Sequence, residues 1–400
     1  MNRKILCILT VLALFTTGLF AAGATEDGIY NGVTNVPFRP TLTADSATLE
    51  NNLYYNPAQL ATNNLIIEAP TASFSGFNCA KALQSKSVQE AVNELKQFKF
   101  TKKSLITVFA GYVYNIGTGR NDVSAVDAGL GTAIKNFAVG LNVKAAAKTL
   151  PDGSPTQSLT TTIMVPVADA AFSFAYGWRV WEKEDRYLDA GFSLKYARKM
   201  YILGLNASNL LENADFENKP ANAGIAFPFD LGLTYGMLDG KLTFSATALN
   251  LNGYYYMHKY ANYKDAIKLK DGLNGYVLYS PWEGNLEARF TPKWQYVNPT
   301  VSLRFDNING FIADDLNTDN GRKPWRELFR HLVLKAELDI LKYAKLDLAF
   351  LHGYPEFGAV VDIFGNSLEI RYGYHEAGTL YGAKPVDTFT IRIKLGYTPH

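Results

Sequence analysis

The feature that most constrains this chain is an alternation of apolar and polar residues with period two. It is most regular in the runs at 171–180, 188–196, 332–340 and 389–397. A period of two is the spacing of a β-strand whose two faces meet different surroundings. Strands in soluble sheets average ~5 to 6 residues, whereas a tilted strand needs ~9 to 11 to cross a bilayer. The runs are long enough for the second case and predict membrane-spanning strands.

The N-terminus predicts export. Arg3 and Lys4 precede an apolar run at 5–20, and the small residues Ala-Gly-Ala follow at 22–24. This is the pattern of a secretory signal peptide, cleaved near Ala24. The apolar run is shorter than the ~20 residues of a transmembrane helix. We therefore expect a chain that is exported to the cell outer membrane.

An exported chain with such strands can enter lipid only as a closed barrel, because lipid cannot hydrogen-bond an open sheet edge. The predicted fold class is all-β, a transmembrane antiparallel β-barrel of about 14–16 strands with an N-terminal hatch or plug. Apolar faces then point to lipid and charged faces to the lumen. A soluble exported β-sandwich or solenoid, with the faces inverted, is the alternative.

The connections also predict a barrel, since outer-membrane barrels have short turns at one end and long loops at the other. Tight turns are expected at 135–136, 239–240, 343–344 and 365–366, and long loops at about 210–222, 253–285, 307–330 and 376–386. Counting from Ser104 gives about sixteen candidate strands, or fourteen if two weak runs fail. Either even number places both ends of the barrel in the periplasm.

The expected organisation has four parts. They are a signal peptide at 1–24, an N-terminal hatch at 25–63, a strand-helix element at 64–103 and the barrel at 104–397. In the third part Leu65 to Phe77 is strand-like, and SVQEAVNELKQF after it is a helix in which Ser87 and Glu90 form a capping box. Whether this strand is an inner plug or the first barrel strand stays open.

Charge and cysteine content exclude several classes. Without Arg3 and Lys4 the mature chain has 37 basic and 37 acidic residues, so nothing favours nucleic acid as a partner. Cys7 leaves with the signal peptide, and Cys79 alone cannot form an intrachain disulfide.

No enzyme or cofactor site is expected. The five histidines are scattered without a metal-binding spacing, and the GxSxG nucleophile motif is absent. A barrel-embedded lipase or protease is the alternative, but no residue is identified as its nucleophile. The acidic stretch with Asp315, Asn317 and Asp319 lacks the glycine and the twelfth-position glutamate of a calcium loop. We expect no catalytic residue, no metal and no cofactor.

The stretch NNLYYNPAQLA at 51–61 carries a helix start. Asn is a favoured N-cap and Pro a favoured first helical residue, so Asn56-Pro57 should begin a short helix reaching about Ala61. The wider stretch at 45–61, together with those at 203–210 and 227–251, resembles the outer-membrane long-chain fatty-acid transporter (FadL-like) superfamily. The resemblance implies that Asn56, Pro57 and Ala58 belong to a hatch inside the lumen.

The resemblance further implies a function. Such a chain would take up hydrophobic small molecules such as long-chain fatty acids passively, capturing them on external aromatic loops and releasing them laterally or past the hatch. Its partners would be hydrophobic small molecules or lipids, outer-membrane lipid and the barrel assembly machinery. The alternative is a surface-exposed scaffold or adhesion barrel that binds a protein partner through its long loops.

Aromatic residues are the candidate ligand contacts, because rings give apolar area at low entropy cost. The candidates are Tyr254, Tyr255, Tyr256, Tyr260, Tyr263, Trp325 and Phe329. The other interpretation is an aromatic girdle that marks membrane depth.

Overall fold

The structure is a computed structural model of the chain. It describes residues 36–38, 49–63, 65–77, 121–150, 163–202, 205–206, 219–268, 272–292, 294, 297–316, 323–340, 343–363, 365–376, 380–383 and 385–397, with isolated residues between 80 and 93. The signal peptide and the strand expected from Ser104 lie outside the described residues. Of the expected helix at 87–98, Gln89, Glu90 and Asn93 are described and are helical.

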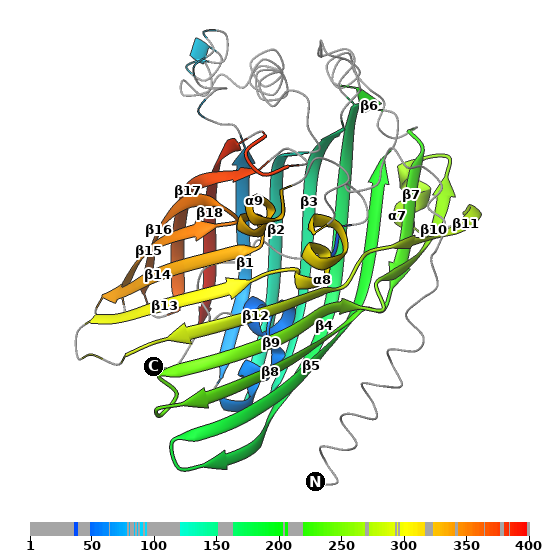
Figure 1. Ribbon diagram of the computed structural model, residues 1–400. Coiled ribbons are helices and arrows are strands. Elements are labelled where there is room, and N and C mark those ends of the chain that lie inside the picture. The colour runs from blue at the N-terminus through cyan, green and yellow to red at the C-terminus, as the bar shows by residue number, and fades with distance from the viewer. Residues whose placement is uncertain are drawn as a thin grey trace.

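The described chain is dominated by β-strands (Figure 1). They are β1 (Ile66–Phe77), β2 (Asn121–Ile134), β3 (Phe137–Leu150), β4 (Ile163–Lys183), β5 (Arg186–Ile202), β6 (Leu205–Asn206), β7 (Ala221–Ala226), β8 (Phe229–Met237), β9 (Leu242–Leu251), β10 (Tyr254–Tyr260), β11 (Leu273–Tyr279), β12 (Glu283–Phe290), β13 (Val297–Phe305), β14 (Leu332–Ile340), β15 (Ala344–Leu351), β16 (Tyr354–Ile363), β17 (Asn366–Glu376) and β18 (Pro385–Tyr397).

The strands close into a barrel of fourteen antiparallel strands. The pairs β5 with β6, β7 with β8, β9 with β10, and β11 with β12 are each one barrel strand with a short interruption, since both members pair with the same neighbouring barrel strand. The ring closes at β1, where Ala72 pairs with Ile393 of β18 and with Ala128 of β2. The barrel prediction is confirmed at the lower strand number, and Ile66–Phe77 forms part of the wall.

The expected tight turns lie at one end of the barrel, and the helical connections lie at the other, together with a tight turn at His352-Gly353. The expected turns are found, with Lys135 (φ 54°), Asp239 (φ 55°) and Gly365 (φ 89°) in the left-handed region that such turns use. The other end has α7 (Tyr263–Lys268), α8 (Ile308–Gly310), η3 (Phe311–Asp315), α9 (Pro324–Glu327) and η4 (Leu328–Arg330).

The prediction of a long loop at 253–285 is wrong. Most of it is β10, α7 and β11, which extend the barrel wall beyond β9 and β12. Aromatic residues occupy both faces of β10, so the sequence there has no period-two contrast that would mark a strand.

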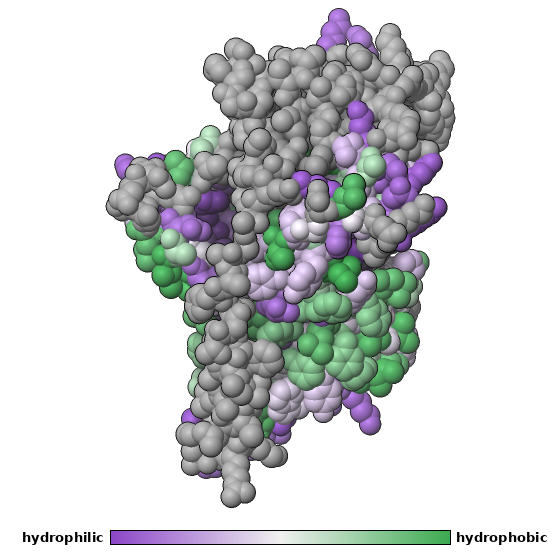
Figure 2. Space-filling model, turned by 90° about the vertical axis from the view of Figure 1, so that its right-hand side faces the viewer, coloured by the Kyte–Doolittle hydropathy of each residue, from purple (hydrophilic) through white to green (hydrophobic). Residues whose placement is uncertain are grey.

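The orientation of the faces is the predicted one. Leu348 and Ile393 point outward and are 54% and 51% exposed, whereas Lys335 and Arg392 point inward and are 7% and 3% exposed. Figure 2 shows the outward residues as a hydrophobic band with hydrophilic residues toward both ends. An apolar band outside and a polar interior define a membrane barrel, so the soluble sandwich or solenoid is excluded.

Among the residues that the structure describes, no helix is long and apolar enough to cross a membrane.

Two short helical elements lie within the ring of strands, α2 (Leu49–Tyr54) and the 3-10 helix η1 (Pro57–Thr62) (Figure 1). The second begins as expected: the Asn56 side chain caps it and Pro57 is its first residue. We call residues 49–62 the inner segment.

Candidate functional site

The inner segment sits on a row of three glycines. Gly177 on β4 pairs with Gly191 on β5, which pairs with Gly232 on β8. A Cβ atom on Gly177 would lie 2.6 Å from the Pro57 carbonyl oxygen, and one on Gly191 would lie 2.6 Å from the Ala58 nitrogen. Any side chain would prevent this approach of backbone to backbone. The three glycines are therefore the seat of the inner segment.

Asn56 fixes the segment on this seat by hydrogen bonds. Its Oδ1 accepts from the Ala58 N–H at 3.1 Å, and its Nδ2 donates to Thr234 Oγ1 on β8 at 3.0 Å. Asn56 has no exposed surface. Loss of either hydrogen bond would leave a buried polar group of Asn56 unpaired, which is destabilising. The Asn56 side chain therefore specifies both the start of the helix and its position on the wall.

Tyr54 holds the segment on its other side. Its hydroxyl donates to the Ala171 carbonyl oxygen at 3.5 Å, and its ring lies 5.3 Å from the Lys195 ammonium. Lys195 forms a buried ion pair with Asp230. The aromatic face thus covers a charge that water cannot reach.

Beyond the inner segment lies a cluster of buried apolar side chains within the barrel, which we call the apolar compartment. Its buried members include Phe38, Val165, Val167, Tyr201, Tyr255, Met257 and Leu278. Phe38 meets the Tyr54 ring edge-on at 5.6 Å, so the compartment is continuous with the inner segment.

Polar groups occur at a few points of this compartment. The Asn222 amide donates to the hydroxyls of Tyr201 at 3.0 Å and Tyr276 at 2.8 Å. Lys199 donates to the Val36 carbonyl oxygen at 3.0 Å and pairs with Asp169 at 2.9 Å. Apolar side chains with a few placed polar groups among them are the usual lining of a small-molecule site.

The inner wall at β14–β18 is different in character. Arg371 pairs with Asp347 at 2.9 Å, with Glu356 at 2.8 Å, and with Glu369. These charges are paired within the wall, which is how buried charges are accommodated. The lumen therefore has an apolar and small-residue side, which holds the inner segment, and a charged side.

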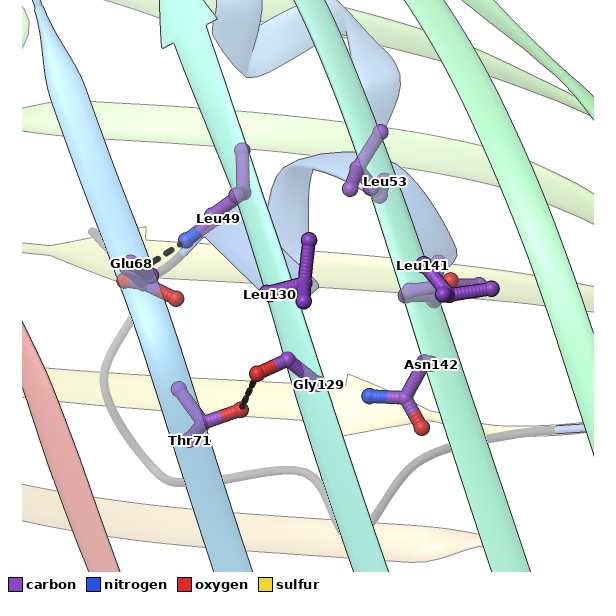
Figure 3. Close-up of a pocket in the computed structure, with 10 residues that line it drawn as sticks. Leu49, Leu53, Glu68, Thr71, Gly129, Leu130, Leu141 and Asn142 are labelled. Atoms are coloured by element: carbon purple, nitrogen blue, oxygen red, sulfur yellow. Dashed lines mark hydrogen bonds between the residues drawn. The ribbon is translucent and has the colours of Figure 1, made fainter.

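A recess in the wall lies beside the inner segment (Figure 3). Its lining combines inward side chains with the outward Leu130 and Leu141. Gly129 and Gly140, each directly before one of these leucines in the chain, also line the recess. The complete lining is Leu49, Leu53, Tyr54, Glu68, Thr71, Gly129, Leu130, Gly140, Leu141 and Asn142.

The strand next to this recess is irregular. The pairing of β1 shifts between Glu68 and Thr71 on both of its edges, toward β18 and toward β2. In contrast, β2 and β3 remain paired across the recess. Near the recess the ladder is therefore interrupted at β1.

The predicted aromatic residues do not form one surface. Tyr255 faces the lumen and is fully buried, Tyr256 on the same strand faces outward, and Tyr260 is covered by α7 on the outer face of the barrel. Tyr254 packs its ring on Tyr279 of β11, and Tyr263 lies on α7. The alternation of a strand separates neighbours that the sequence places together.

The other two predicted aromatics belong to a different connection. Trp325 lies on α9 and is 65% exposed, while Phe329 packs against Phe350 and Tyr381. Of the acidic stretch, Asp315 bonds to His331, and residues 317–320 lie outside the described residues. Over the described part of the chain, no three His, Cys, Asp or Glu side chains are grouped to hold a metal.

The glycine seat was not predicted, although a sequence signal for it exists. Gly177, Gly191 and Gly232 each fall on the polar face of an alternating run, where a small residue leaves room in the lumen. Thr234 has no comparable signal, because only the folded barrel brings it to Asn56.

The fold and site define a class, a transmembrane β-barrel whose lumen contains part of its own N-terminal chain. No family model matches the sequence, and no curated protein matches it. Several solved structures are similar. The toluene transporter TbuX of Ralstonia pickettii is 9% identical with a TM-score of 0.44, covering 96% of this chain and 100% of its own.

Two further solved structures are similar to this chain. The CymD monoaromatic hydrocarbon channel is 11% identical with a TM-score of 0.43, covering 96% of this chain and 98% of its own. A FadL homologue of Pseudomonas aeruginosa is 9% identical with a TM-score of 0.38, covering 95% and 100%. One of these structures is thus described as a homologue of FadL, the name carried by the superfamily that the sequence motif resembles.

Proposed function

We propose that this chain is an outer-membrane channel for the passive uptake of hydrophobic small molecules, and that the inner segment is its hatch. One observation carries the proposal: residues 49–62 occupy the lumen on a seat that is shaped for their backbone. A barrel of fourteen strands has more lumen than its own side chains fill. Because packing and a few hydrogen bonds hold the inner segment, it can leave the lumen without breaking the strand pairing of the wall.

The apolar compartment is the proposed site for the transported molecule. It adjoins the hatch at Phe38 and Tyr54, so a molecule that displaces Phe38 also removes a contact of the hatch. Apolar burial supplies the affinity, and the hydroxyls of Tyr201 and Tyr276 offer an orienting polar contact. Of the predicted aromatic contacts, Tyr255 lines this compartment, and Trp325 is the exposed ring that we propose for first capture.

The proposed exit is at the recess beside β1. There the pairing of Glu68 to Thr71 is interrupted on both edges, and glycines replace side chains in the adjacent wall. Release of Leu49 and Leu53 would open the recess toward the lumen. A hydrophobic molecule would then pass sideways into lipid, down its own gradient and without any reaction.

Uptake by cells tests the proposal. The chain is expressed in a Gram-negative host that lacks its own fatty-acid channel, and initial uptake of labelled oleate and labelled toluene is compared with an empty vector. We chose toluene because a similar structure is described as a toluene transporter. Uptake of at least one compound above vector, with unchanged uptake of a labelled sugar, supports the proposal.

The opposing result is equally clear. Absence of uptake of both compounds, by a barrel that shows heat-modifiable gel migration and retains no lipid by mass spectrometry, contradicts the proposal. It favours the scaffold or adhesion barrel. A second form lacking residues 25–61 separates the roles, because removal of the hatch should change uptake if the hatch controls it.

A further inference from the structure

Tyr55 connects the inner segment to the connection between β13 and β14. Its hydroxyl donates to Asp306 Oδ1 at 3.0 Å, and the two residues are 251 positions apart in the chain. The Arg304 guanidinium lies 4.7 Å from the centre of the Tyr55 ring and bonds to both carboxylate oxygens of Asp306, at 2.7 and 2.9 Å. Since Tyr55 directly precedes Asn56, this contact adjoins the glycine seat.

Asp306 also holds the start of β14 through its backbone. The Asp306 N–H donates to the His331 carbonyl oxygen at 2.7 Å, and the Asp306 carbonyl oxygen faces His331 Nδ1 at 2.8 Å. One residue therefore contacts the inner segment with its side chain and His331 with its main chain.

His331 in turn fixes the short helices of this connection. Its Nε2 lies 2.7 Å from Asp315 Oδ2 on η3, and both side chains are 8% exposed. The Phe311 ring packs edge-on against the imidazole at 5.3 Å, and the Phe305 ring lies 5.8 Å from it. The connection is thus folded around this imidazole.

The two bonds of His331 require one extra proton. A backbone carbonyl only accepts, so Nδ1 must carry a hydrogen. A hydrogen must then also lie between Nε2 and Asp315 Oδ2, either on the ring or on the carboxyl. Neutral histidine beside an ionised carboxylate cannot make both bonds, because its second nitrogen and the carboxylate would both be acceptors.

We propose that His331 and Asp315 form a proton-dependent latch, which holds the hatch closed through Asp306 and Tyr55. The latch regulates the channel proposed above and rests on that function for its meaning. With the shared proton present, the connection at 306–316 is pinned and Asp306 is positioned for Tyr55. Loss of the proton as the pH rises breaks the bond to Asp315, frees η3 and weakens the hold on Tyr55.

Other charged groups around His331 act on the same proton. Among the described residues these include Asp306 at the end of β13, Asp315 on η3, Arg304 on β13 and His352 in the turn before β16, whose Nε2 lies 3.8 Å from Asp306 Oδ2. Because the closed form binds one more proton than the open form, it is favoured at lower pH.

Thiol labelling of the purified full chain tests the latch without any substrate. In a Cys79→Ser background, the buried Leu60→Cys reports release of the hatch, and the exposed Thr62→Cys is the control at each pH. We expect the ratio of alkylation rates, Leu60→Cys over Thr62→Cys, to rise about tenfold or more from about pH 6 to about pH 9, because one linked proton allows up to about tenfold per pH unit.

Three variants decide the result. Asp315→Asn lets a neutral His331 keep both bonds without the extra proton, so the ratio should stay low and flat; His331→Gln, which also lacks the titrating ring, should be flat too. Tyr55→Phe should give a high ratio at both pH values. A flat wild-type ratio, the same rise in Asp315→Asn, or a low ratio in Tyr55→Phe overturns the latch. Because no transport is measured, these outcomes are independent of the uptake result.

Discussion

Gly191 of β5 lies directly against the backbone of Pro57, so closely that a Cβ on Gly191 would be 2.6 Å from the next nitrogen, that of Ala58. The inner segment and the barrel wall therefore fit at main-chain level, and the fit depends on the absence of side chains on the glycines. This relationship leads to the first prediction.

Gly191→Ala should loosen the hatch while the barrel still forms. The added methyl must push the Pro57 backbone away, and overpacking of this kind costs about 1–3 kcal/mol. In planar bilayers we expect openings about tenfold to a hundredfold more frequent than in the wild type. Gly275→Ala is the matched control, since its nearest new contact would be the flexible His258 side chain at 3.3 Å. Equal opening frequencies in both variants would argue against the seat.

Asn56→Ala should release the hatch by a different route. The change removes the acceptor of the Ala58 N–H and the donor to Thr234, both fully within the lumen. Leaving buried groups unpaired costs about 1–3 kcal/mol. Alkylation of the Leu60→Cys reporter measures the effect, and Gln59→Ala, which loses one half-buried bond to Asn51, is the control. If the Leu60→Cys reporter is alkylated at the same rate in both variants, Asn56 does not hold the inner segment in place more than Gln59 does.

Lys195→Met should destabilise the folded barrel. It leaves the Asp230 carboxylate buried without its cation, although the Asn250 N–H still donates to it at 2.8 Å. Breaking a buried pair on one side typically costs about 3–5 kcal/mol. Urea unfolding in lipid vesicles measures the change, with Arg186→Met as control, since Arg186 is 57% exposed and pairs with Asp185 at 3.7 Å. A loss of similar size in the control would contradict the prediction.

Leu348→Arg should be destabilising because it places a charge in the lipid-facing band. Leu348 lies in the middle of β15 and is 54% exposed, whereas Ile363, 53% exposed, ends β16 beside a turn. A lipid-facing Arg costs about 2–4 kcal/mol at the midplane and about 0–1 near the interface. The temperature of the heat-modifiable gel shift should fall clearly for Leu348→Arg and little for Ile363→Arg. The reverse order would place the membrane elsewhere on the barrel.

The aromatic cluster shows where sequence reasoning was limited. Tyr254, Tyr255 and Tyr256 are adjacent in the chain and look like one loop surface. In the barrel they are part of β10, with Tyr255 in the lumen and Tyr256 on the outer face. Because aromatic residues suit both lipid and an apolar lumen, composition alone could not tell the two faces apart.

The sequence by itself determined the local features of this protein. Period-two runs fixed the strands and which face meets lipid, turn residues such as Asp239-Gly240 fixed the tight connections, and Asn56-Pro57 fixed a helix start. Each of these follows from backbone preferences or from solvation of a single segment. Only the tertiary structure decided that β1 completes the ring, that three glycines from separate strands form one seat, and that Asp306 reaches Tyr55. These depend on which distant segments pair and in what register, and that choice comes from closing the whole barrel at once.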